Sequence, residues 1–460
     1  MEQECKERAL RSASENKMGT RPVLPLLLSM AFPPMLSMLI QSLYNIVDSM
    51  FVARYSEDAL TAVSLAFPLQ TLIVACSVGI GVGVNSYIAR MLGQRNQEEA
   101  DSAVAHGLLM AIAASILFAA IGFTGMNGFF RMFTSDQAIL ADSLLYAKIC
   151  IAFCFGPFIH ICIEKVFQAT GKMLFPMALQ AIGAILNVIL DPIMIFGYFG
   201  MPAMGVAGAA IATIIGQLTA MTLSFLVLIL FRHDVKLRFS GFHYNGNMVK
   251  QILAVAIPNA CMNALGSVLV MGLNAILIGF STTAVSLFGV YYKLQTFVFM
   301  PASGLSQGAM PIMGYNYGAR SRKRLLDCLK YSIAVCLMIM GAGCLLFEAI
   351  PGPLLSLFSA SEEMMEIGIP ALRIISISFI PAAVGFIMPT MFQAMGKGMD
   401  SLVVFLMRQL VITLPLAWLL SGPLGLTGIW VSFIVAEAAG AVTAMGIYRK
   451  IRKQDAVLGN

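Results

Sequence analysis

Apolar stretches long enough to cross a bilayer recur along nearly the whole chain, separated by short polar segments. A spanning helix needs about 20 predominantly apolar residues, because an α-helix rises about 1.5 Å per residue. Of the 460 residues only 11% are charged and 59% are hydrophobic, whereas a soluble domain carries about 25% charged residues. The remaining polar surface is too small to coat a water-soluble globule, so we predict a polytopic membrane protein.

Turn signals and charges divide these stretches into predicted transmembrane helices, and the predicted fold class is an all-α integral membrane protein. Several stretches exceed the bilayer thickness, which indicates tilted helices or interfacial ends. The first 21 residues are polar and contain no signal-peptide core, so the first apolar stretch is expected to begin the membrane domain. Twelve spans are predicted, at residues 22–47, 59–90, 103–125, 138–163, 173–197, 205–231, 250–279, 284–316, 326–349, 364–390, 400–421 and 424–448.

Lysine and arginine gather in alternate loops, and this asymmetry predicts the orientation. With a cytoplasmic N-terminus, the segments on that side hold 23 of the 29 basic residues, and the opposite loops hold only Arg54 and Arg131. Both termini are therefore expected in the cytoplasm of a multi-pass protein of the plasma (inner) membrane. The net charge of +6 is then explained by basic loops beside the membrane. Membrane lipids are expected as partners, and nucleic acid is not.

The sequence repeats itself at an offset of 225 residues. Pro33 aligns with Pro258, and FQATGK (Phe167–Lys172) aligns with FQAMGK (Phe392–Lys397). Towards the end of each half the offset shortens to 220. Further residues share the 225 offset, namely Gly79, Gly83, Gly93 and Arg95 in the first half with Gly304, Gly308, Gly318 and Arg320 in the second.

An even number of spans in each copy gives the two halves the same orientation, related by a pseudo-two-fold axis along the membrane normal. Secondary transporters that rock two bundles around a central cavity have this architecture. The predicted parts are a cytoplasmic segment at 1–21, a six-helix lobe at 22–231, a linker at 232–249, a second six-helix lobe at 250–448 and a tail at 449–460.

Ionisable residues within spans are costly and mark functional candidates. Asp48 lies near the outer end of the first span, and Asn187 and Asp191 lie one turn apart in the fifth. Thr213 lies about two turns below the outer surface in the sixth span, so these four side chains can share one layer. Their oxygens suit a hard cation such as Na⁺, and the two carboxyl groups could alternatively share a proton. For Asp48, an interfacial position at a helix end is the competing interpretation.

Arg408 and Glu437 reach a similar depth on neighbouring antiparallel spans, and we expect a structural ion pair between them. Lys148 and Arg373 occupy equivalent repeat positions, where long side chains can reach the interface. Lys293 lies deeper, and the sequence indicates no role for it.

Several of these motifs together resemble the multidrug and toxic compound extrusion (MATE) transporters. They are the first span ending in Asp48, the NxxxD of Asn187 and Asp191 before Pro192, GVAGAAIAT at Gly205–Thr213, GLSQGAMPIMGYNYGAR at Gly304–Arg320, and the repeated FQAxGK. The resemblance implies a V-shaped pair of six-helix lobes that exports organic cations and amphipathic drugs in exchange for Na⁺ or H⁺. By similarity, Asp48, Asn187, Asp191 and Thr213 match the cation-coupling cluster of the N-terminal lobe.

The chain departs from some family members, which carry further acids in the C-terminal lobe. Here no acidic residue occurs in the corresponding stretch of the seventh span, PNACMNALGSVLVMGLN at 258–274, or in residues 372–390 of the tenth span. Ion coupling is therefore expected to rest on the first copy.

Two other classes compete with a drug antiporter. A flippase for a lipid-linked precursor would need several basic residues around its cavity, and only Lys148, Lys293, Arg373 and Arg408 were identified within spans. An intramembrane enzyme is not expected, because His106 and His160 lack a nucleophile or metal-ligand spacing. No cofactor is expected either.

The Gly79–Gly83 stretch lies within an apolar helix, where close helix packing or a bend explains it better than a nucleotide loop.

Overall fold

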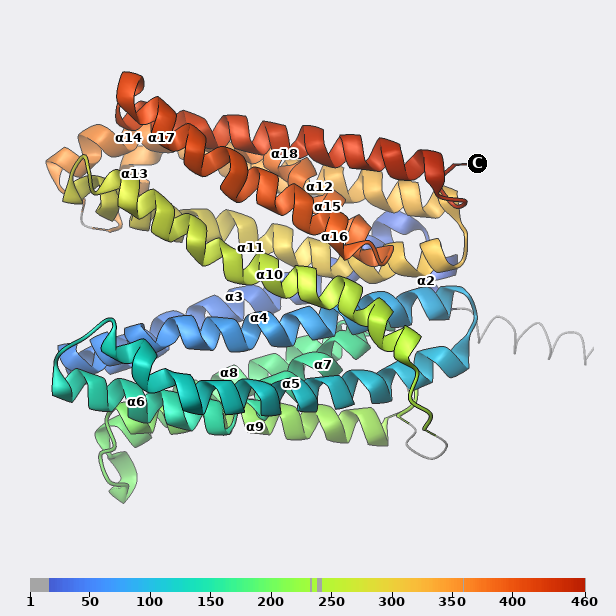
Figure 1. The fold of residues 1–460 in the computed structure, drawn as a ribbon, viewed down its shortest axis with the longest axis horizontal. Helices are drawn as coiled ribbons and strands as arrows, with labels where there is room; N and C mark the ends of the chain where they lie inside the picture. The colour runs from blue at the N-terminus through green and yellow to red at the C-terminus, as the bar shows by residue number, and fades with distance from the viewer. Residues whose placement is uncertain (1–15, 232–233, 238–241, 359, 460) are drawn as a thin grey trace, which may run out of the picture.

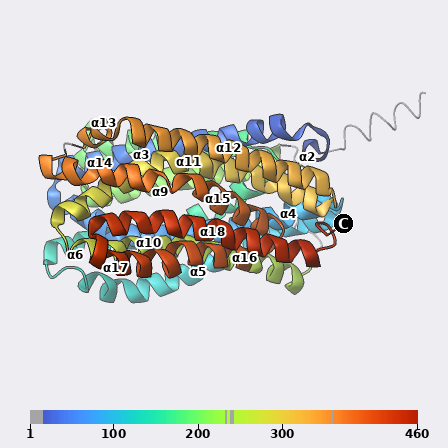
Figure 2. The ribbon, with the colours of Figure 1, turned by 90° about the horizontal axis from the view of Figure 1, so that it is seen from above.

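A computed structural model describes residues 16–231, 234–237, 242–358 and 360–459. The predicted cytoplasmic segment up to residue 15 and parts of the predicted linker lie outside the described residues. The described chain is helical, and its helices form two bundles that lie one above the other in Figure 1. Figure 2 shows that the long helices of both bundles run along the same axis.

The first bundle, which we call the N-lobe, begins with the short helix α2. Its long helices alternate in direction, as expected for helices joined by short loops. The elements are α2 (Lys17–Thr20), α3 (Val23–Tyr55), α4 (Glu57–Gly93), α5 (Gln97–Arg131), α6 (Gln137–Ala152), α7 (Phe155–Ala169), α8 (Leu174–Phe196), the 3₁₀ turn η1 (Tyr198–Gly200) and α9 (Val206–Leu230).

The second bundle, the C-lobe, repeats this order. It adds a short helix between its third and fourth spans and a π-helical turn in its fifth. The elements are α10 (Gly246–Leu277), α11 (Thr282–Gly318), α12 (Arg322–Ala349), α13 (Pro351–Ser356), α14 (Glu362–Ser376), α15 (Phe379–Ala394), α16 (Gly398–Leu406), the π-turn η2 (Met407–Ile412), α17 (Thr413–Leu424) and α18 (Leu426–Gln454).

Each predicted span corresponds to a helix or a broken helix. Within the described residues, nine helices are long and apolar enough to cross a membrane, and the bent pairs α6–α7 and α14–α15 bring this number to eleven. The one remaining predicted span, the eighth at residues 284–316, is α11, which is 37 residues long but less apolar. It packs against α3 and α4 of the N-lobe and α12 and α15 of the C-lobe, so much of its surface faces protein rather than lipid.

The two bent pairs occupy equivalent places in the repeat, with bends of 47° and 48°. Pro157 and Pro381 lie just after these bends. Neither has an N–H group to donate to the carbonyl four residues earlier, so the helix is interrupted there. Three pairs of repeat-equivalent residues also share positive φ angles: Arg95 (60°) with Arg320 (54°), Gly171 (77°) with Gly396 (83°), and Gly205 (52°) with Gly425 (58°). The duplication read from the sequence is therefore present in the backbone.

Glycines of the repeat bring the two lobes into backbone contact. A Cβ atom at Gly79 or Gly83 of α4 would lie 2.6 or 2.5 Å from backbone oxygens of α10. A Cβ at Gly304 or Gly308 of α11 would lie 2.6 Å from backbone atoms of α3. Small residues allow this close approach of helices in membranes. The expectation that the Gly79–Gly83 stretch serves close helix packing is confirmed.

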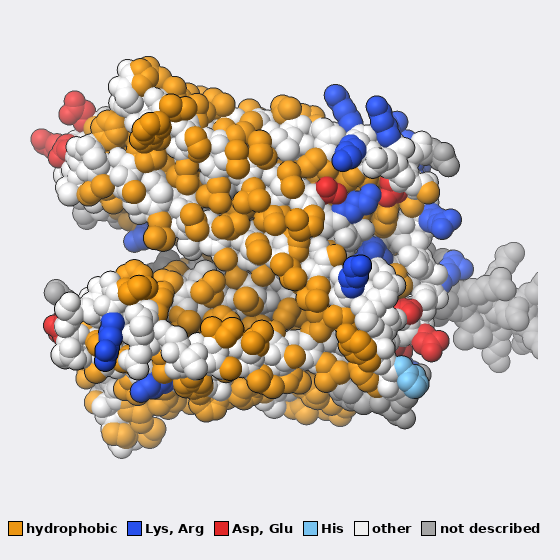
Figure 3. Space-filling view, viewed as in Figure 1, with side chains coloured by type: hydrophobic (Ala, Val, Ile, Leu, Met, Phe, Trp, Pro, Cys, Tyr) orange, Lys and Arg blue, Asp and Glu red, His pale blue; other side chains and the backbone are white. Residues whose placement is uncertain are grey.

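The lobes meet at one end of the molecule and diverge at the other. At the joined end, a Cβ at Gly93 would lie 2.0 Å from the Tyr315 carbonyl oxygen, and one at Gly318 would lie 2.1 Å from that of Arg90. Figure 3 shows many of the visible Lys and Arg side chains near this end and a hollow between the lobes towards the opposite end. We call the joined end the basic end.

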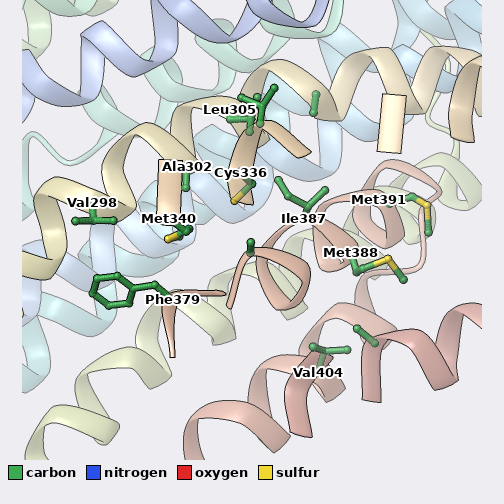
Figure 4. Close-up of a cluster of buried hydrophobic side chains, with 14 of the residues drawn as sticks. Val298, Ala302, Leu305, Cys336, Met340, Phe379, Ile387, Met388, Met391 and Val404 are labelled. Atoms are coloured by element: carbon green, nitrogen blue, oxygen red, sulfur yellow. The ribbon is translucent and has the colours of Figure 1, made fainter. Parts of the chain in front are cut away.

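A continuous apolar core fills the C-lobe. Val298, Ala302 and Leu305 of α11 face Cys336 and Met340 of α12 and side chains of α15 and α16 (Figure 4). Phe379, Ile387 and Met391 are fully buried. The cysteines of this core act as small apolar side chains.

We predict that Gly308→Val separates the lobes at the basic end. The added side chain meets the α3 backbone, and overpacking of this kind costs about 1–3 kcal/mol. Spin labels attached at Glu98 and Lys330, one on each lobe, should report a longer distance than in the parent protein. Gly289→Val is the matched control in the same helix, because nothing lies within 4 Å of a Cβ there. Equal distances in both variants would contradict the close-packing account.

Candidate functional site: an acidic layer beside a central cavity

Three helices of the N-lobe bring the predicted acidic layer together. Asp48 lies on α3, Asn187 and Asp191 on α8, and Thr213 on α9, and α8 packs against both other helices. At about 1.5 Å per residue, these positions lie roughly 7 to 14 Å from the ends of their helices away from the basic end. Asp191 is fully buried, and Asn187 and Thr213 are 2% and 4% exposed. Asp191 therefore lies in protein rather than at an interface.

Hydrogen bonds connect the layer. The Asn187 Nδ2 group donates to Asp191 Oδ1 and Thr213 Oγ1, each at 3.3 Å. The carboxyl groups of Asp48 and Asp191 lie within hydrogen-bonding range of each other. The Tyr44 side chain also lies within hydrogen-bonding range of the Thr213 side chain. Tyr44 was not identified from the sequence, although it lies one helical turn before Asp48 on the same face.

Unpaired oxygens make this layer suitable for a cation or a proton. Among the described residues, the buried atoms Asp48 Oδ1, Asn187 Oδ1 and Asp191 Oδ2 have no hydrogen-bond partner. Leaving a buried acceptor unpaired costs about 1–3 kcal/mol, so a proton or cation bound among these three oxygens would stabilise the layer. Pro192 adds a further acceptor, because it has no N–H for the Val188 carbonyl.

A cavity of about 730 Å³ lies between the lobes. Tyr44, Asn187 and Thr213 line it, whereas Asp48 and Asp191 do not. The two carboxyl groups thus lie behind the cavity wall. Much of the polar lining consists of side-chain amides from both lobes, namely Gln41, Gln70, Gln168, Gln180, Gln217, Asn259, Asn263, Gln307 and Gln393.

A polar cluster joins the lobes at this cavity. Lys165 Nζ donates to Gln307 Oε1 at 2.8 Å, to Gln168 Oε1 at 3.0 Å and to Glu164 Oε1 at 3.2 Å. Gln307 belongs to α11 of the C-lobe, and the other three belong to α7. The fourth span was predicted to end at residue 163, before Lys165, and this boundary is wrong, because α7 continues to Ala169. The Lys165 side chain is therefore only 7% exposed.

Arg408 and Glu437 form an ion pair in the C-lobe, with 3.1 Å between Arg408 Nε and Glu437 Oε1. Arg408 also donates through Nη1 to the Gly385 carbonyl oxygen at 3.1 Å and lies in the π-helical turn η2. The three other basic residues that were predicted within spans are not buried. Lys148, Lys293 and Arg373 are all exposed on their helices.

Two helical lobes around a central cavity, related by an internal repeat, define a secondary-transporter architecture. Comparison with known proteins identifies the family. The MatE family model matches residues 33–193 and again residues 258–419, one match in each lobe. The chain belongs to the MatE family of membrane transporters.

Curated relatives match across almost their whole length. The chain is 25% identical over 438 residues to a FAD transporter of Shewanella oneidensis, covering 94% of this chain and 95% of that protein. It is also 25% identical over 436 residues to the multidrug export protein MepA of Staphylococcus aureus, covering 94% of both. One relative is thus named for FAD transport and the other for multidrug export.

Solved structures have the same fold. A MATE protein in complex with MaL6 superposes with a TM-score of 0.90 at 25% identity, covering 96% of this chain and 99% of that one. A MOP superfamily transporter from Pyrococcus furiosus, described as having a binding pocket of reverse polarity, gives a TM-score of 0.89 at 25% identity, with 94% and 97% covered. The predicted two-lobed helical fold and family are confirmed.

We predict that Arg408→Met lowers the free energy of unfolding by about 3 kcal/mol, because it leaves the Glu437 carboxylate buried without its partner. The double variant Arg408→Met/Glu437→Leu should recover much of this loss, since no charge remains to be buried. Thermal unfolding in detergent measures both. A double variant as unstable as Arg408→Met would contradict a purely structural ion pair.

Proposed function

We propose that the protein is an antiporter that exports cationic or amphipathic small molecules in exchange for Na⁺ or H⁺, with coupling through the N-lobe carboxyl groups. The observation that carries this proposal is the pair formed by Asp48 and Asp191 directly behind the cavity wall. Its oxygens are buried, partly unpaired and adjacent to cavity-lining side chains. An ion that enters this layer can therefore change the wall that a cargo molecule contacts.

The coupling follows from electrostatics. Two neighbouring carboxylates repel each other strongly in a medium of low dielectric constant, so the layer favours a bound proton or cation. Binding would draw Asp48 of α3 towards Asp191 of α8, and Tyr44 moves with Asp48 because both lie on α3. The proposed exchange is that cation binding reshapes the cavity wall and releases cargo, and cargo binding from the other side favours release of the cation.

The cavity chemistry supports amphipathic cargo. Amide groups donate and accept hydrogen bonds, and methionines such as Met38, Met177 and Met310 supply adaptable apolar surface. The flippase alternative has less support, because Lys165 and Arg408 are the basic side chains in the described lining and each has an acidic partner. A lipid diphosphate would compete poorly for them.

The orientation also belongs to this proposal. We expect the basic end to face the cytoplasm, with both termini there and the hollow facing outward, in a cell membrane. The lobes would then be closed on the cytoplasmic side and ready to release cargo outside.

We predict that Asp191→Asn abolishes export, because the layer can no longer bind and release a charge. Cells that produce the variant should lose resistance to exported cationic dyes and accumulate them, as measured by fluorescence. Asp58→Asn is the matched control, since Asp58 is exposed near the same end of the N-lobe and should leave export unchanged. Both variants should elute from size-exclusion chromatography as the parent does. Full export by a well-folded Asp191→Asn protein would overturn the proposal.

A further inference from the structure

A second cavity, of about 620 Å³, lies at the basic end, away from the acidic layer. Three arginines line it: Arg95, Arg320 and Arg324. No Asp or Glu residue lines it among the residues that the structure describes. Thr20 of α2 and Tyr315 of α11 complete part of its wall. This cavity shares no lining residue with the central cavity between the lobes, and its assignment does not rest on the proposed antiport.

Both lobes contribute to this basic cavity. Arg95 follows the end of α4 in the N-lobe, and Arg320 is its repeat equivalent after α11 in the C-lobe. The close approach of Gly93 and Gly318 to the opposite helix holds these two helix ends together. The equivalent arginines therefore share one cavity in the arrangement seen here, and they would separate if the lobes parted at this end.

Among the described residues, no acidic side chain of the cavity lining balances the positive charge of the arginines. Arg324 donates to the Asn316 side-chain oxygen at 3.1 Å and to the carbonyls of Met18 and Arg21 at 3.0 and 2.7 Å, all of which are neutral acceptors. The C-termini of α4 and α11 also lie here, and each contributes roughly −0.5 of a charge. Counting the described lining alone, three arginines against two helix C-termini leave about two positive charges uncompensated.

Two further basic residues flank the lining residues Gly19 and Thr20 in the sequence: Lys17 in α2 and Arg21 directly after it. Burial, together with the positive charge of Arg21, lowers the pKa of Lys17. Asp234 is the acid that acts on Lys17 and also lies 4.0 Å from Lys172. One carboxylate, that of Asp234, is therefore shared between two lysines beside α2.

We propose that the basic cavity binds an anionic phosphate group, supplied either by a lipid headgroup or by a soluble phosphate compound. Arginine is suited to this ligand, because its planar guanidinium group donates two parallel hydrogen bonds to phosphate oxygens. A volume of about 620 Å³ holds a headgroup or a small phosphate ester. Since the arginines come from both lobes, the bound anion stabilises the state in which the lobes are joined at this end.

Binding of inorganic pyrophosphate to the full-length protein in neutral detergent, by isothermal titration calorimetry, tests the soluble source. Nanodiscs with and without phosphatidylglycerol test the lipid source through the unfolding temperature. Arg95→Gln and Arg320→Gln should each weaken the affinity for pyrophosphate by about tenfold. In nanodiscs, each should reduce the rise in unfolding temperature that phosphatidylglycerol produces. Lys323→Gln is the matched control, because Lys323 is exposed in the following helix and does not line the cavity.

Gly308→Val tests the requirement for joined lobes without changing any arginine. It lies outside the cavity lining and should weaken binding, whereas Gly289→Val should not. A response to one probe alone supports the site and identifies its source. No response to either probe, or an equal loss in Lys323→Gln, would overturn the site. Unchanged binding in a folded Gly308→Val protein would overturn the two-lobe arrangement.

Discussion

Backbone contact between the lobes at the basic end is the constraint on which the rest of this structure depends. Helix pairs approach so closely there that a single added carbon at Gly83, Gly93 or Gly318 would collide with a backbone oxygen of the other lobe. With this end joined, the lobes diverge towards the other end, and the central cavity lies between them. The contact thus sets both the shape of the cavity and the side from which it is reached.

The acidic layer uses this geometry asymmetrically. The duplication supplies two similar scaffolds, but the positions equivalent to Asp48 and Asp191 are Leu273 and Leu416. Leu273 is fully buried in the C-lobe core, where a carboxyl group would be costly. One lobe therefore carries the oxygen cluster and the other provides an apolar core, so any cation acts on the N-lobe wall of the cavity.

Much of the fold could be predicted from the sequence. Span number, the internal repeat and the grouping of Asp48, Asn187, Asp191 and Thr213 follow from hydropathy, spacing and depth, which are local or periodic properties. The predicted end of the fourth span was wrong because Lys165 resembles a loop residue by charge. Its three hydrogen bonds, one of them to Gln307 far away in the sequence, permit burial of the amine, and no local pattern reveals them.

Other features depended on tertiary contacts in the same way. The polarity of α11 reflects its burial between the lobes, and the contact of Tyr44 with Thr213 joins two helices far apart in the chain. The basic cavity required the equivalent loops of both repeats to meet. Arg95 and Arg320 are equivalent in the sequence repeat, but equivalence in a repeat does not place two residues side by side.

Transport by purified protein in sealed vesicles, with a Na⁺ or an H⁺ gradient imposed alone, tests the central claim most directly. The account predicts that one of these gradients drives uphill movement of a cationic dye, and that Asp48→Asn or Asp191→Asn removes this movement while the protein stays folded. Gradient-driven dye transport that persists in the folded double variant would contradict the assignment of coupling to the N-lobe carboxyl pair.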